Sequence, residues 1–257
     1  KRLQVARAVE VFSAVQGMVQ DMQVINRTPD AQGYRALLTD LDGTLIHSQD
    51  AICEALFCSF AEIDARVPEK QEILSMFGLP VEEMLISLGG VSRAEEERIA
   101  DFIAAYKRWY PVKMRTGAKL ITNAKETVDA VATAGYPVCL ITSERRDNAR
   151  FILDTLKLSG AVRCMITRDD VVNFKPNPEP ILLAAQLVGM AVEQCVYVGE
   201  SPYDIEAGVA AGAYVAAVAS GGYPAESLLA CNPDLLLSDI SELTALFAGA
   251  ERIGLSC

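Results

Sequence analysis

The sequence has few of the residues that build several common kinds of site. Its 257 residues include one histidine, His47, and its seven cysteines contain no C-x-x-C pattern. A zinc site of the usual kind is therefore excluded, and a Ser-His-Asp or Cys-His enzyme would depend on His47 alone. Repeats and low-complexity tracts are absent, and 51% of the residues are hydrophobic. This composition excludes fibrous and wholly disordered proteins.

Basic residues are the scarcer charged type. The chain has 23 basic and 34 acidic residues, which gives a net charge of −11. A negative field repels phosphate backbones and anionic lipid, so we expect neither nucleic acid nor membrane as a partner. An anionic substrate would need a local cation or a helix N-terminus to overcome this repulsion.

The cysteines and the apolar runs indicate the cellular compartment in which we expect the protein. The cysteine count is odd, and Cys139 and Cys195 lie inside apolar runs, so we expect buried thiols in a reducing, cytoplasmic compartment. Polar residues interrupt the first apolar stretch, and we expect no signal peptide. The longest uncharged stretch, residues 207–225, contains four glycines and Pro224, which predicts a helix end, a turn and a strand rather than a membrane span.

Short apolar runs bounded by turn residues predict buried strands. They lie at residues 36–39, 138–142, 162–167, 195–199, 214–219 and 234–238. Helical patterns lie between them, at residues 124–134, 146–156, 178–188 and 204–211. Because strands and helices alternate, we expect an α/β fold with a parallel sheet covered by helices on both faces.

Two segments depart from this alternation. Residues 48–110 show helical patterns without a convincing strand, which predicts a helical insert after the first strand, placed as a lid over the carboxyl ends of the strands. Residues 1–28 carry apolar residues at alternating spacings of three and four from Val5 to Met22, which predicts a further helix. That helix would dock on its own domain, join two copies as a homodimer, or act as a basic targeting segment.

Two carboxylates follow the first strand, at Asp40 and Asp42 of the run D-L-D-G-T-L. Residues at i and i+2 share one side of an extended chain. Like charges this close are tolerated when a cation lies between them or one is protonated, so the pair indicates Mg²⁺ and acid–base chemistry. Gly43 allows a sharp turn, and a purely structural turn is the alternative for an isolated D-x-D-G.

Further polar groups follow other predicted strands. Thr142 and Ser143 follow the second, where either could cap the next helix and face an anion. Lys175 lies in N-F-K-P-N-P, whose prolines stiffen the chain, and Glu200 and Asp204 follow the fourth strand. Taken singly they are a cap, a surface lysine and a helix start. Together they indicate one site at the carboxyl edge of the sheet.

With these motifs in this order, residues 35–245 resemble the phosphatases of the haloacid dehalogenase (HAD) superfamily. The stretches FGLPVEEMLISL, KPNPEPI and VGESPYDIEAGVAAGA resemble its phosphoglycolate phosphatase and PpaX-type pyrophosphatase branch. The resemblance implies a Rossmann-like core over residues 34–50 and 112–250 and a small helical cap over residues 51–111. An N-terminal helical extension would occupy residues 1–33.

The resemblance also implies roles for the site residues. Asp40 would be the nucleophile that forms an aspartyl phosphate, and Asp42 the general acid and then the general base. Thr142 and Lys175 would neutralise the transferred phosphoryl group. The implied phosphate-binding set is Thr142, Ser143, Lys175 and Gly43, and the implied cap residues nearest the substrate are Met76, Phe77, Gly78 and Leu79.

Mg²⁺ is the cofactor that the resemblance implies. Its ligands would be Asp40, the backbone carbonyl of Asp42, Glu200 and Asp204. Glu200 stands where the family usually has Asp, and its extra methylene changes the reach to a metal that demands near-ideal geometry. Asp204 is therefore expected to be the safer ligand. His47 also departs from the family pattern, and we expect it to have an entrance or surface role.

The expected function is Mg²⁺-dependent hydrolysis of a small phosphorylated metabolite. The candidate substrates are a phosphoglycolate-like ester, a sugar or nucleotide phosphate, and pyrophosphate. The second aspartate of the D-x-D argues against carbon–halogen chemistry, because the superfamily's dehalogenases lack it. Two alternatives stay open: a catalytically weak binding or regulatory protein on the same fold, and a phosphotransferase or mutase.

Overall fold

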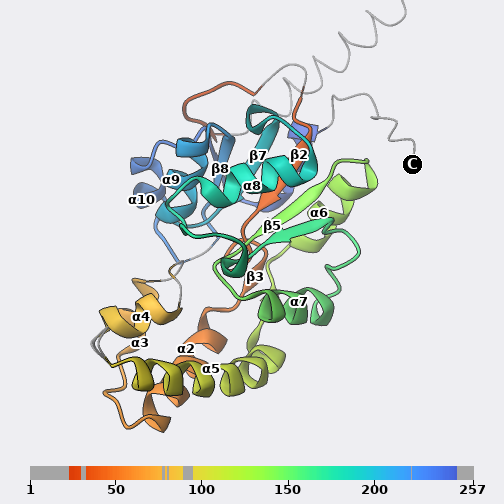
Figure 1. The fold of residues 1–257 in the computed structure, drawn as a ribbon. Helices are drawn as coiled ribbons and strands as arrows, with labels where there is room; N and C mark the ends of the chain where they lie inside the picture. The colour runs from red at the N-terminus through yellow and green to blue at the C-terminus, as the bar shows by residue number, and fades with distance from the viewer. Residues whose placement is uncertain are drawn as a thin grey trace, which may run out of the picture.

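The computed structural model describes residues 23–29, 33–76, 79, 81–88, 95–220 and 222–247. Within these ranges, seven strands form one sheet in the order β1-β9-β8-β7-β2-β5-β6 (Figure 1). All neighbouring pairs are parallel except β1 and β9. The strands are β1 (Gln23–Val24), β2 (Ala36–Thr39), β5 (Val138–Ile141), β6 (Cys164–Ile166), β7 (Cys195–Gly199), β8 (Tyr214–Val218) and β9 (Leu235–Leu237).

Every strand predicted from an apolar run is present, and each end falls within two residues of its predicted place. β2 lies between β5 and β7, with Leu38 opposite Cys139 on one side and Tyr197 on the other. The chain continues from β2 to β5 on one side of it and returns later to β7 on the other. The carboxyl end of β2 is therefore a topological switch point, where open α/β sheets bind ligands.

Helices cover both faces of the sheet, which confirms the predicted fold class. Leu37 and Val196 face a core shared with α6 (Ala124–Thr133), α7 (Arg146–Thr155) and the 3₁₀ helix η3 (Ile240–Phe247). Leu38 and Tyr197, one residue further along, face α8 (Glu179–Val188) and α9 (Pro202–Ala211). A smaller apolar cluster joins α9 and β8 to α10 (Ala225–Ala230). This alternation follows from the two-residue repeat of a strand.

The segment after β2 is helical, with α2 (Gln49–Glu62), α3 (Lys70–Leu74), α4 (Val81–Ser87) and α5 (Glu96–Gly117). Figure 1 shows these helices gathered beyond one end of the sheet. α2 and α5 pack on each other through aromatic side chains such as Phe60 and Phe102, whose ring centres are 5.0 Å apart. The exact boundaries of a cap domain stay a prediction.

Two short strands join the helical segment to the sheet, and the sequence analysis missed both. They are β3 (Ile46–His47) and β4 (Lys119–Leu120), which pair antiparallel. With two residues each, they carry too little pattern to be recognised. His47 is exposed on β3, in line with the surface role expected for it.

The helix predicted over residues 1–28 is wrong for its last part. Gln23 and Val24 form β1, which pairs with Leu236 and Leu235. The apolar spacing ends at Met22, and pairing with the open edge of β9 decides the conformation that follows. The remaining residues, 1–22, lie outside the described residues, so the predicted homodimer helix stays a prediction.

Arg27 fixes the segment that follows β1. Its guanidinium donates to both carboxylate oxygens of Asp234, at 2.7 and 2.5 Å, and lies 5.6 Å from the centre of the Tyr214 ring.

In the described part of the chain no helix has the length and apolar character that a bilayer crossing requires.

Candidate active site

The two aspartates of the D-x-D run lie at the switch point. The backbone N–H of Asp40 still donates to the Val198 carbonyl of β7, at 2.9 Å, and the chain then leaves the sheet. Gly43 makes the turn with a φ of +83°, and its N–H donates to the Ile46 carbonyl. A Cβ at Gly43 would lie 2.3 Å from Glu200 Oε1. Only glycine leaves room for that carboxylate.

Lys175 forms a buried ion pair with two carboxylates. Its Nζ donates to Asp40 Oδ1 at 2.7 Å and to Asp204 Oδ1 at 2.6 Å, and 4% of its side chain is exposed. Burial alone would lower the pKa of Lys175, but Asp204 and Asp40 raise it, so the ammonium stays charged. The lysine predicted from the N-F-K-P-N-P run thus lies beside the proposed nucleophile.

Asp204 is held by donors of the protein itself. Its Oδ1 accepts from Lys175 and from the Tyr197 hydroxyl at 2.7 Å, and its Oδ2 accepts from the Ser201 hydroxyl at 2.6 Å. The Ser201 hydroxyl in turn accepts from the Asp204 N–H, which makes a capping box at the start of α9. Burial would raise the pKa of Asp204, but Lys175 and these hydroxyls lower it.

Glu200 reaches the same region from the end of β7. Its Oε2 accepts from the Gly222 N–H at 2.8 Å, and 2% of the residue is exposed. Burial, together with the charges of Asp204 and Asp40, raises the pKa of Glu200 to about 8. A buried carboxylate close to other carboxylates is a group that a cation would stabilise.

Asp42 has a different environment from Asp40. The Ser48 hydroxyl donates to its Oδ1 at 2.5 Å and fixes the carboxylate. Burial and the nearby charge of Glu144 raise the pKa of Asp42 to about 7. An acid that titrates near neutral pH is suited to giving and taking a proton during turnover.

The Thr142–Ser143 turn follows β5 as predicted, but neither residue caps the next helix. The Thr142 hydroxyl accepts from the Glu144 N–H at 3.1 Å, and α7 begins at Arg146 with Arg145 as its N-cap. The Asp169 carboxylate, from the short 3₁₀ helix after β6, accepts from the Arg146 N–H at 2.9 Å instead. The capping prediction is wrong because this separate 3₁₀ helix supplies the acceptor.

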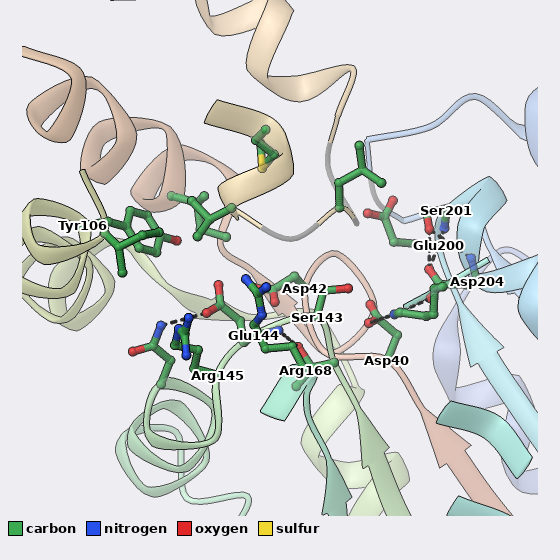
Figure 2. A pocket seen from close by; sticks show the side chains of 18 of the residues that line it. Asp40, Asp42, Tyr106, Ser143, Glu144, Arg145, Arg168, Glu200, Ser201 and Asp204 are labelled. Atoms are coloured by element: carbon green, nitrogen blue, oxygen red, sulfur yellow. Dashed lines mark hydrogen bonds and ion pairs between the residues drawn. The ribbon is translucent and has the colours of Figure 1, made fainter. Parts of the chain in front are cut away.

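A pocket of about 60 Å³ opens over these groups, between the sheet edge and the helical segment. Figure 2 shows Asp40 and Asp204 on one side, Glu144 and Arg145 on the other, and Asp42, Ser143 and Arg168 between them. The lining residues from the sheet side are Asp40, Asp42, Thr142, Ser143, Glu144, Arg145, Asn148, Arg168, Lys175, Glu200, Ser201 and Asp204; those from the helical segment are Ile52, Leu79, Val81, Met84, Ile103, Tyr106 and Lys107.

The predicted cap residues and the predicted phosphate-binding role of Gly43 can be compared with the lining of the pocket. Leu79 lines the pocket, whereas Met76 does not. Phe77 and Gly78 lie outside the described residues. The Gly43 N–H already donates within its own turn, so nothing directs it at a phosphate group.

Several pocket residues were missed by the sequence analysis. Arg145 and Arg168 follow the carboxyl ends of β5 and β6, a position that could have drawn attention to them. Tyr106 and Lys107 lie one turn after Ile103 on α5 and line the pocket with it. The helical pattern predicted this helix but not which of its residues contact the pocket.

The oxygen atoms that the site offers fit a magnesium ion that takes its remaining ligands from water. Among the described residues, no three acidic, histidine or cysteine side chains form a ready-made metal cluster. Asp40 and Glu200 supply two carboxylates, and Asp42 a backbone carbonyl, all of them oxygen donors. Mg²⁺ is commonly held by one or two carboxylates with waters and substrate phosphate. Asp204 accepts short hydrogen bonds of 2.6–2.7 Å at both oxygens, whereas Asp40 Oδ2 accepts from Thr44 at 3.3 Å. The geometry therefore favours Asp40 and Glu200 over Asp204, which was expected to be the safer ligand.

Comparison with known proteins gives a consistent result. The family model described as haloacid dehalogenase-like hydrolase matches residues 37–218. A pyrophosphatase PpaX of Anoxybacillus flavithermus is 28% identical over 216 residues, covering 84% of this chain and 98% of that protein. A phosphoglycolate phosphatase of Shigella boydii is 25% identical over 231 residues, covering 82% and 92%. The crystal structure of a predicted phosphoglycolate phosphatase from Haemophilus somnus has a TM-score of 0.75 at 20% identity and covers 83% of this chain and 98% of that one.

Proposed function

The chain belongs to the haloacid dehalogenase-like hydrolase family, and from this we propose that it is a Mg²⁺-dependent phosphatase acting on a small phosphorylated metabolite through an aspartyl phosphate. The curated relatives named as pyrophosphatase and phosphoglycolate phosphatase support this reaction class. The single observation that carries the proposal is the buried Asp40–Lys175–Asp204 network beside Asp42.

The first half-reaction is attack of an Asp40 carboxylate oxygen on the phosphorus atom. Lys175 binds Asp40 Oδ1, and Oδ2 has only a 3.3 Å hydrogen bond from the Thr44 hydroxyl. A bond forms between Asp40 and phosphorus, and the bond from phosphorus to the leaving oxygen breaks. Asp42 gives its proton to that oxygen, and the charge of Lys175 stabilises the phosphoryl oxygens.

The second half-reaction releases phosphate. Water attacks the phosphorus atom of the aspartyl phosphate while Asp42, now ionised, takes the water's proton. The bond to Asp40 breaks and the carboxylate is restored. The hydrogen bond from Ser48 keeps Asp42 oriented through both steps.

Asp40, Glu200 and the Asp42 carbonyl would hold Mg²⁺. When bound, the ion would neutralise the negative charge that Asp40, Glu200 and the phosphoryl group bring together. Burial, with the charges of Asp204 and Asp40, raises the pKa of Glu200, and a cation would offset these effects by stabilising the ionised carboxylate, which supports this assignment. We propose Glu200, ahead of Asp204, as the second carboxylate ligand.

Pocket size favours a small substrate. A volume of about 60 Å³ holds roughly four water molecules, and it is well below the ~300 Å³ at which drug-sized ligand pockets begin. The free cysteines of the described residues fit a reducing, cytoplasmic setting, which we propose as the place of action.

Phosphate release tests the proposal. The purified chain is assayed with pyrophosphate, 2-phosphoglycolate, a sugar phosphate and a nucleoside monophosphate, with Mg²⁺ and with chelator, beside Asp40→Asn. We expect turnover that needs Mg²⁺ and falls by at least about 10³-fold in Asp40→Asn, which keeps the side-chain shape but loses the nucleophile. Metal-independent turnover, or full activity in Asp40→Asn, would contradict the proposal.

A phosphotransferase differs in its acceptor. The same groups would serve an alcohol in place of water. Alkyl phosphate that forms in place of free phosphate when small alcohols are added, at constant substrate consumption, would identify this alternative.

A further inference from the structure

A cluster of charges borders the pocket and has no part in the proposed mechanism. We call Arg145, Arg168 and Glu82 the distal cluster. Arg145 Nη2 lies 2.8 Å from Glu82 Oε1, and the Arg168 guanidinium pairs with Glu82 Oε2. Two arginines from the core therefore bind one carboxylate of α4, in the helical segment.

Arg168 lies between the two loops that bear the phosphate-binding groups. It begins the 3₁₀ helix η1 (Arg168–Asp170) directly after β6, and its N–H donates to the Glu144 carbonyl at 3.1 Å, beside Thr142 and Ser143. Its guanidinium lies 5.2 Å from the centre of the Phe174 ring, and Phe174 directly precedes Lys175. The side chain is 14% exposed, so its position is well defined by packing.

The guanidinium is held from outside the pocket. Arg168 lines the pocket and Glu82 does not. In the described ranges Glu82 is the ionic partner of Arg168 and engages it at Nη1. A guanidinium has five N–H donors, and a single carboxylate pairing leaves donors for another anion.

We propose, on the basis of the phosphatase function above, that Arg168 binds a second anionic group on the substrate, with Arg145 beside it and Glu82 as a positioning residue. The preferred substrates are then phosphate esters or anhydrides whose leaving group carries a carboxylate or a phosphate. Arginine is suited to this task because its planar donors match both groups. The net charge of −11 makes such a local cation necessary for a substrate with two negative groups.

The proposal predicts discrimination between matched substrates. 2-Phosphoglycolate and ethyl phosphate differ by a carboxylate, and pyrophosphate and methyl phosphate differ by a second phosphate. For the wild type we expect kcat/KM to be higher for the member with the second anionic group in at least one pair. The pair whose ratio falls in Arg168→Gln identifies the group bound, because the intrinsic reactivity of each substrate is the same for both enzymes. In Arg168→Gln this ratio should fall by about 10- to 100-fold, and in Arg168→Lys by less.

Glu82 acts through the arginines, so its effect has a different form. We expect Glu82→Gln to raise KM for the substrate with the second anionic group by about threefold or more, with little change in kcat, because the guanidinium loses its fixed position. A fall in kcat alone, with KM unchanged, would contradict a positioning role.

Arg146 supplies the matched control. It is the next residue after Arg145, it pairs with Asp170 at 2.5 Å, and it does not line the pocket. Arg146→Gln should keep the substrate ratio of the wild type. If Arg168→Gln keeps that ratio too, or Arg146→Gln lowers it equally, the proposal is wrong, while turnover of either substrate pair leaves the phosphatase function standing.

A binding measurement separates the two claims without turnover. Methylenediphosphonate carries a second anionic group that methylphosphonate lacks, and both resist hydrolysis. Titration calorimetry of the full chain with Mg²⁺ should show tighter binding of methylenediphosphonate, lost by about 10-fold or more in Arg168→Gln. Equal affinities in the wild type would overturn the distal site. A preserved preference in a chain that hydrolyses nothing would support the site and contradict the phosphatase function.

Discussion

At the scale of single residues, Gly43 shows how closely the site is packed. Its φ of +83° and the 2.3 Å approach to Glu200 Oε1 both act against a side chain. We expect Gly43→Ala to destabilise the chain by about 1–3 kcal/mol and to weaken Mg²⁺ binding by about tenfold or more, since the methyl group displaces Glu200. Urea unfolding and calorimetric Mg²⁺ titration measure the two effects.

Gly189 is the matched control for this variant. It also has a positive φ, of +75°, but no atom lies within 4 Å of a Cβ built there. Gly189→Ala should be destabilised without any change in Mg²⁺ affinity. Equal loss of Mg²⁺ affinity in both variants would mean that backbone strain, and not contact with Glu200, explains the result.

Glu200 predicts a pH dependence of metal binding. Its pKa of about 8 means that near neutral pH the metal-free site holds a proton that Mg²⁺ must displace. Affinity for Mg²⁺ should therefore rise from pH 6.5 to pH 8.5, by up to about tenfold per pH unit below the pKa for one displaced proton. Affinity that is flat over this range, or a Glu200→Gln variant with unchanged affinity, would exclude Glu200 as a ligand.

The raised pKa values of three carboxyl groups also determine whether the free energy of unfolding rises or falls with pH. Asp40 and Asp42, with pKa values of about 7, and Glu200 hold protons in the folded chain that the unfolded chain releases above about pH 4. In the metal-free protein their contribution to the free energy of unfolding falls as pH rises from about 4 to about 8. Denaturant unfolding with chelator should show this decline, and added Mg²⁺ should reduce it most at the higher pH.

At the scale of elements, the start of α9 links stability to the site. Ser201 caps the helix and also binds the Asp204 carboxylate that holds Lys175. Ser201→Ala should cost about 1 kcal/mol of unfolding free energy and lower kcat, whereas Ser201→Thr, which keeps the hydroxyl, should lose less of both. Urea unfolding and phosphate release would test this, and equal effects of the two changes would show that the hydroxyl has no such role.

Elements differ in how far the sequence predicts them. The buried strands were found because each is a short apolar run bounded by turn residues, and Asp40, Asp42, Thr142 and Lys175 were found because each follows a strand. β3 and β4 have two residues each and no pattern of their own. The start of α7 was predicted correctly, but its capping residue was not, because the acceptor, Asp169, comes from the separate element η1.

In the whole molecule, segments that are far apart in the chain come into contact. The pairing of Glu82 with Arg145 and Arg168 joins residues more than 60 positions apart. No local pattern records such a contact, so the residues that follow strands were predicted as site residues and the two arginines were not. Our proposal of Glu200 ahead of Asp204 as a metal ligand also rests on such contacts, because Tyr197 and Ser201 donate to Asp204 only in the folded chain.

Two truncated chains, starting at residues 23 and 29, test what β1 and Arg27 contribute to stability. A chain starting at residue 23 keeps β1 and the bonds from Arg27 to Asp234, whereas one starting at residue 29 loses both and leaves the buried Asp234 with fewer partners. We expect the shorter chain to be less stable than the longer by roughly 1–3 kcal/mol in urea unfolding.

The predicted homodimer helix is tested by light scattering of the full chain and of the chain that starts at residue 23. The same number of chains per particle in both would contradict the dimer.

The proposed aspartyl phosphate on Asp40 can be trapped and located. The chain is acid-quenched during turnover of its best substrate, and its peptides are mapped by mass spectrometry. We expect the added mass of one phosphoryl group on Asp40, present with Mg²⁺, absent with chelator and absent in Asp40→Asn. Phosphorylation of any other residue as the source of product, or sustained turnover by Asp40→Asn, would contradict the account.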